Sequence, residues 1–168
     1  MSVPNQPEVG NYFSRESSLA LFQPQRATLV TAAATLTTAQ SGATCLFNAA
    51  AGFTYTLPAI TAATVGTRFR FIVTVTNTSS NHKIATDAAT TYLKGSILMA
   101  IEDTTPAANP GPKDFLFNGT SHISCTMNGT TTGGLHGTMI EVIAISATQW
   151  FIQGYVKASG IIATPAAT

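Results

Sequence analysis

Hydrophobic and polar residues alternate with a period of two from Ala27 onward. In "RFRFIVTVT", residues 68–76, the alternation puts Phe69, Phe71, Val73 and Val75 on one face of an extended chain. Alternation of this kind, rich in β-branched and aromatic residues, is typical of half-buried strands. Eight strands are predicted in this way, at residues 43–48, 53–57, 68–76, 82–87, 92–103, 121–129, 137–146 and 149–158.

Turn signals separate these strands at short intervals. They include Ser41-Gly42, Asn118-Gly119, Asn128-Gly129 and Gly133-Gly134. The "AAAG" stretch between the first two strands predicts a hairpin-like turn, and the last two strands form a second pair. With no 3.6-residue periodicity, the pattern favours an all-β sandwich or barrel. "TTPAANPGPKD", residues 104–114, is predicted to be an exposed loop because proline is excluded from strand interiors.

The chain divides into three parts by composition. Residues 1–26 contain three prolines and isolated apolar groups, which predicts an extended arm able to dock on a neighbouring molecule; a frayed terminus is the alternative. Residues 27–160 form the β-sandwich domain. Residues 161–168 are predicted to be a short C-terminal tail.

Charge is scarce. Charged residues make up 9% of the chain, against about 25% in a typical domain, and the net charge is +1. This balance predicts no direct nucleic-acid binding. No apolar run reaches the ~18 residues that cross a membrane, and no signal peptide is visible, so synthesis in the cytoplasm is expected. A surface with so little charge is either permanently covered by partners or belongs to a Thr-rich extracellular β-protein.

The residues that could support catalysis or metal binding are few and scattered. Cys45 and Cys125 lack CxxC spacing and are predicted to be buried free thiols. His82, His122 and His136 are expected at turns or on the surface, without the nearby ligands of a metal site. No nucleophile motif or carboxylate pair suited to hydrolysis stands out. We therefore predict a protein that is not an enzyme, with no catalytic, metal or cofactor site.

Two stretches carry a resemblance to a known family. "TLTTAQSGATCLFNAAAGFTYTLP", followed by "GTRFRFIVTVTNTSSNHKIATD", and later "NGTTTGGLHGTMIEVIAISATQWFIQGYV" resemble the head decoration, or capsid cement, proteins of tailed bacteriophages. The resemblance covers residues 28–164, approximately, and brings no catalytic motif. It implies an antiparallel, jelly-roll-like β-sandwich that sits on the outer surface of the virion capsid and bridges neighbouring major capsid proteins as a homotrimer.

The arm residues follow from this interpretation. If the protein decorates a capsid, the anchors of the arm are the expected capsid contacts: Tyr12, Phe13, Arg15, Leu19, Leu21, Phe22 and Arg26. The alternative function is a phage fibre or spike module, or a carbohydrate-binding sandwich. A sugar site would need exposed aromatic side chains, for which Trp150, Tyr155 and Tyr55 are the candidates.

Overall fold

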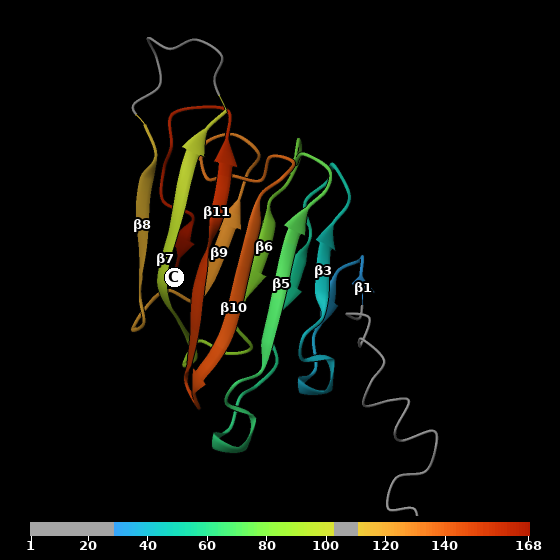
Figure 1. Ribbon diagram of the computed structural model, residues 1–168, viewed down its shortest axis with the longest axis vertical. Coiled ribbons are helices and arrows are strands. Elements are labelled where there is room, and N and C mark those ends of the chain that lie inside the picture. Colours follow the sequence, from blue (N-terminus) through green and yellow to red (C-terminus); the bar gives the residue numbers. More distant parts are fainter. Residues whose placement is uncertain (1–28, 103–110) are drawn as a thin grey trace, which may run out of the picture.

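The computed structural model describes residues 29–102 and 111–168, and these residues form two packed β-sheets (Figure 1). The seven-stranded sheet has the order β1-β3-β5-β10-β11-β7-β8, and the five-stranded sheet has the order β12-β9-β6-β4-β2. The strands are β1 (Leu29–Val30), β2 (Ala34–Thr35), β3 (Thr44–Phe47), β4 (Thr54–Thr56), β5 (Arg68–Val73), β6 (His82–Ala85), β7 (Tyr92–Ile101), β8 (Lys113–Asn118), β9 (Ser124–Met127), β10 (Met139–Ser146), β11 (Gln149–Ala158) and β12 (Ala166–Ala167).

The predicted all-β sandwich is confirmed, but the expected antiparallel pairing holds for only part of each sheet. From β1 to β6 the chain alternates between the two sheets, and each strand from β1 to β4 pairs in parallel with the strand two places further on. β7 and β11 are also parallel. The antiparallel pairs involve β8, β9, β10 and β12. Both sheets are therefore mixed.

The predicted hairpin at "AAAG" is wrong. β3 lies in the seven-stranded sheet and β4 in the five-stranded sheet, so the turn carries the chain across the sandwich. The two strands meet through their side chains: the rings of Phe47 and Tyr55 lie 5.0 Å apart, edge to face. The Tyr55 hydroxyl then donates to the carbonyls of Val30 and Leu46, each at 2.9 Å, which ties β4 to the edge of the opposite sheet.

The structure confirms one further prediction and changes the expected boundaries of the loop and the C-terminal tail. The final pair is confirmed as the antiparallel β10–β11 hairpin. Lys113 and Asp114, assigned to the loop, instead open β8, directly after Pro112. The expected C-terminal tail ends in β12, which pairs with Cys125 and Ser124 of β9. The expected arm, residues 1–26, lies outside the described residues.

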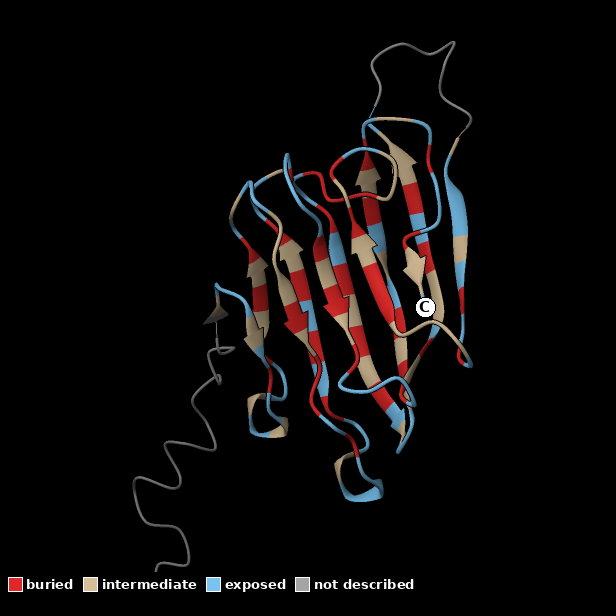
Figure 2. Cartoon of the chain, turned by 180° about the vertical axis from the view of Figure 1, so that it is seen from behind, coloured by how far each residue is buried: buried red, intermediate tan, exposed pale blue. Residues whose placement is uncertain are grey.

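The core lies between the two sheets (Figure 2) and combines aliphatic with large aromatic side chains. Its largest fully buried side chains include Trp150, Tyr55, Phe47, Phe69 and Phe71. Both predicted thiols, Cys45 and Cys125, are free and fully buried. Trp150 belongs to this core as its alternation with Ile152 indicates. The interior face of every long strand is thus committed to packing, and any binding surface must lie elsewhere.

Close contact between β7 and β11 depends on one glycine. Gly95 has a φ of 138°, and a Cβ at this position would meet the backbone carbonyl of Ile152 on β11. Glycine allows both the backbone angle and the approach. As a result β7 and β11 pair over ten residues each, from Gln149↔Tyr92 to Ala158↔Ile101.

Candidate docking surface

The outer face of the seven-stranded sheet carries large apolar side chains in a row across the strands. The register places Leu46 of β3 beside Ile72 of β5, then Met139 of β10, Tyr155 of β11 and Leu98 of β7. Met139, Tyr155 and Leu98 are exposed, by 46%, 41% and 44%. We call these five residues the apolar row. Exposed apolar side chains that form a contiguous group mark a surface that contacts something else more often than scattered ones do.

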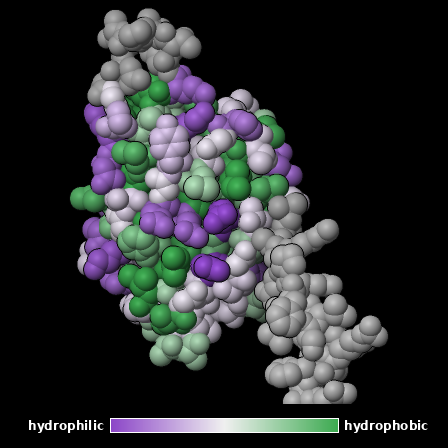
Figure 3. All heavy atoms as spheres, in the orientation of Figure 1, coloured by the Kyte–Doolittle hydropathy of each residue, from purple (hydrophilic) through white to green (hydrophobic). Residues whose placement is uncertain are grey.

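A polar row runs beside the apolar row, one pleat further along the strands. It consists of Thr44, Arg70, Glu141, Gln153 and Ser96, each in register with the next. Glu141 lies 4.0 Å from the guanidinium of Arg70 and accepts a hydrogen bond from Gln153 at 3.2 Å. Because Arg70 is half exposed, this ion pair is worth little to stability and leaves its donors open to a partner. Figure 3 shows the resulting mixture of hydrophobic and hydrophilic side chains on this face.

Two shallow depressions lie on the same face. The larger, about 420 Å³, is lined by Leu98, Met139, Tyr155 and polar neighbours that include Asp114, Glu141 and Gln153. The smaller, about 180 Å³, is lined by Gly42, Thr44, Arg68, Arg70 and Glu141, beside the edge where the described chain begins. Apolar side chains and unsaturated hydrogen-bonding groups thus alternate across the face, which suits recognition of an amphipathic polypeptide segment or protein surface.

The sequence also contains a pattern that indicates this surface: apolar residues at outward positions of two strands. In β10, Met139, Ile143 and Ile145 alternate with the core residues, so both faces of the strand are apolar. In β11, Phe151 and Tyr155 do the same. A strand whose outward positions should be polar but are apolar predicts that its outer face is covered.

The predicted arm contacts all lie outside the described residues; they are Tyr12, Phe13, Arg15, Leu19, Leu21, Phe22 and Arg26. Of the three aromatic residues considered for sugar binding, Trp150 and Tyr55 are fully buried, and Tyr155 alone lies on the outer face. The structure therefore does not bring them together into a stacking platform.

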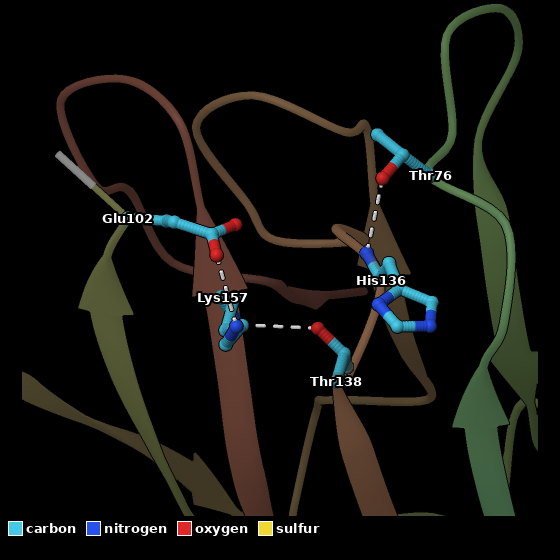
Figure 4. A network of polar contacts seen from close by, with 5 residues as sticks. All are labelled: Thr76, Glu102, His136, Thr138 and Lys157. Carbon is cyan, nitrogen blue, oxygen red and sulfur yellow. Dashed lines mark hydrogen bonds and ion pairs between the residues drawn. The ribbon is translucent and has the colours of Figure 1, made fainter. Parts of the chain in front are cut away.

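The three histidines lie far apart in different settings. His82, expected at a turn or on the surface, is instead fully buried between the rings of Phe47 and Phe53. His122 accepts a hydrogen bond from the backbone N–H of Asn118 within a loop. His136 is exposed and is held through its backbone N–H, which donates to Thr76 (Figure 4). Within residues 29–102 and 111–168, no three His, Cys, Asp or Glu side chains are grouped as metal ligands.

Two carboxylates of the described chain, Glu102 and Glu141, make structural contacts. Glu102 pairs with Lys157 at 3.1 Å, and the backbone N–H of Lys157 donates to Thr138, which ties together the ends of β7, β11 and β10 (Figure 4). Glu141 belongs to the polar row. Asp103, which follows Glu102, lies outside the described residues. Burial raises the pKa of the Cys45 and Cys125 thiols to about 12, so neither is a nucleophile in the folded chain.

The two Asn-Gly-Thr stretches form the same kind of loop. The side-chain oxygen of Asn118 accepts hydrogen bonds from the backbone N–H groups of Thr120, Ser121 and His122. The side-chain oxygen of Asn128 accepts from Thr130, Thr131 and Thr132 in the same way. Both amide groups also donate to a hydroxyl three residues on. These asparagines build turns, which is a structural reason for the repeated pattern.

The described residues contain no helix with the length and apolar character to cross a membrane. Comparison of the chain with protein-family models, curated proteins and solved structures finds no match.

Proposed function

We propose that the protein is a structural virion protein that decorates a bacteriophage capsid, bridging neighbouring major capsid proteins as a trimer. The apolar row carries the proposal: a chain with 9% charged residues places large apolar side chains on the outer face of its larger sheet. The resemblance at residues 35–76 and 128–165 supplies the class of partner. The scattered histidines and the structural carboxylates of the described chain agree with a binding role.

Capsid attachment would gain from multiple weak contacts. A trimer that holds one capsid protein raises the effective concentration of its remaining contacts, so each contact needs only modest affinity. An amphipathic face of alternating apolar and polar rows suits such a contact, because the apolar row contributes burial and the polar row fixes the register. The arm would add contacts of its own.

The test is co-sedimentation of the protein with emptied phage heads, with light scattering on the free protein to give its mass. Decoration predicts a trimer that pellets with heads and raises the temperature at which they break. Leu98→Glu, which puts a charge into the apolar row, should reduce head binding. Thr78→Glu adds the same charge at an exposed loop position and is the matched control. A monomer that ignores heads in both the unmodified and control forms would refute the proposal.

A further inference from the structure

The apolar row begins beside the point where the described chain begins. Leu46 lies on β3, the strand next to β1, and Leu29 of β1 pairs with Thr44. Thr44 also lines the smaller depression, together with Arg68, Arg70 and Glu141. Any residues that precede Leu29 therefore join the domain at the edge from which the apolar row extends and beside which the smaller depression lies.

The segment that precedes Leu29 has the length and composition to cover this face. The row from β3 to β7 crosses four strand spacings, about 19 Å at ~4.8 Å each. Residues 1–28 could span about 90 Å if extended, at ~3.3 Å per residue. The segment contains Tyr12, Phe13, Leu19, Leu21 and Phe22, whose side chains match an apolar row.

The charges of the two parts are complementary. The segment carries Glu8 and Glu16, which can pair with the exposed Arg68 and Arg70, and Arg15 and Arg26, which can pair with Glu141 and Asp114. All four sheet residues line the two depressions. Surface pairs of this kind add little affinity but select the orientation of a docked segment.

We propose that in the free protein the N-terminal segment, residues 1–28, docks across the outer face of the seven-stranded sheet and covers the apolar row. The segment comes from the same copy or from a neighbouring copy. Covering this row removes exposed apolar side chains of a sparsely charged surface from water. The inference concerns the free protein and does not require the proposed function. If that function holds, the segment must leave the sheet before the segment and the apolar row can each contact a capsid.

Methionine oxidation tests the proposal on the full chain. Met139 belongs to the apolar row and is 46% exposed in the described part, whereas Met99 and Met127 are fully buried. Oxidation by peroxide follows the exposure of the sulfur, so the rate at Met139, measured by peptide mass spectrometry, reports whether the row is covered. Met99 and Met127 report that the fold is intact.

Two full-length variants sharpen the test. One replaces the apolar anchors Tyr12, Phe13, Leu19, Leu21 and Phe22 with serine. The other replaces Asn5, Gln6, Asn11, Gln23 and Gln25 with serine, so that it changes five residues of the same segment and keeps the anchors. The expected result is a Met139 rate several-fold higher in the first variant than in the unmodified protein, with the second variant unchanged. Dependence of the protection on protein concentration would indicate that the segment comes from a neighbouring copy.

Two results would overturn the inference. An equally fast rate at Met139 in all three proteins would mean that nothing covers the row. An equally slow rate in all three would mean that something other than the anchors covers it. Neither result bears on head binding, which co-sedimentation measures separately.

Discussion

His82 gives the folded protein a defined sensitivity to acid. Its ring is fully buried, 4.4 Å from the ring of Phe47 and 5.2 Å from that of Phe53. Nδ1 accepts a hydrogen bond from the backbone N–H of Phe53 at 3.3 Å, which places the proton of the neutral ring on Nε2. Nε2 makes no hydrogen bond of standard geometry among the described residues. Adding a second proton would break the bond to Phe53 and leave a buried charge.

The direction of the pH effect follows from these contacts. Burial lowers the pKa of His82 below its usual value of 6.5, and the Ala49 carbonyl opposes this shift only in part. The unfolded chain therefore binds the proton more readily than the folded chain. The free energy of unfolding keeps its full value above pH 6.5 and falls as the pH drops towards the folded-state pKa. Within that window the loss from one group approaches about 1.4 kcal/mol per pH unit.

Urea unfolding curves from about pH 7.5 to about pH 5.5 measure this loss, with His82→Phe as the comparison. Phenylalanine fits between the same two rings and cannot titrate, so the variant should lose less stability on acidification than the unmodified protein. His122, His136 and the carboxylates are present in both proteins, and their contributions cancel in the difference. Equal losses in the two proteins over this range would refute the assignment of a buried neutral His82.

Three further predictions test the fold itself. Tyr55→Phe removes the hydroxyl that donates to Val30 and Leu46 and should lower the free energy of unfolding, measured in urea, by about 1–3 kcal/mol. Tyr92 is half-buried on the outer face, so the control Tyr92→Phe should lower it little. Gly95→Ala should prevent β7–β11 pairing and abolish soluble expression. Gly42 has a φ of 88° but open space around it, so Gly42→Ala should lower the free energy of unfolding by only about 1–2 kcal/mol. Asn128→Asp keeps the oxygen that accepts three N–H groups and should melt above Asn128→Ala in a thermal scan; the reverse order would contradict the loop assignment.

The strands β3 to β7 and β9 to β11 could be predicted from the sequence because alternation reports directly on burial, whereas β1, β2, β8 and β12 were not predicted. Phe69, Phe71 and Val73 face the core as the period of two requires. Their pairing could not be predicted in the same way. A hairpin and a crossing between sheets both reverse the chain after a short turn, and the residues 48–53 fit either. What separates them is whether the strands bond through their backbones or meet through side chains such as Phe47 and Tyr55, and that depends on the rest of the sandwich.

The candidate surface could not be predicted from the sequence for a related reason. Met139 and Tyr155 lie 16 residues apart in sequence, and Leu46 lies far from both, so no local pattern joins them. Only the register of β3, β5, β10, β11 and β7 puts them in one row. His82 begins the predicted strand 82–87, but its burial was missed, because its polar neighbours "SN" indicate an exposed turn. The burial is imposed by Phe47 of β3 and by Phe53, which directly precedes β4.

The mixed topology links the surface to complete folding. β3 and β5 belong to the part of the chain that winds between the sheets, whereas β10 and β11 form a hairpin some 70 residues later, and β7 joins the far side of that hairpin. The apolar row takes residues from all three parts, and two contacts unite them: the antiparallel pairing of β5 with β10 and the parallel pairing of β11 with β7. A chain that has formed only one part has no continuous row to offer. If the proposed docking occurs, it is therefore restricted to the fully folded sandwich, as the proposed binding to a capsid would require.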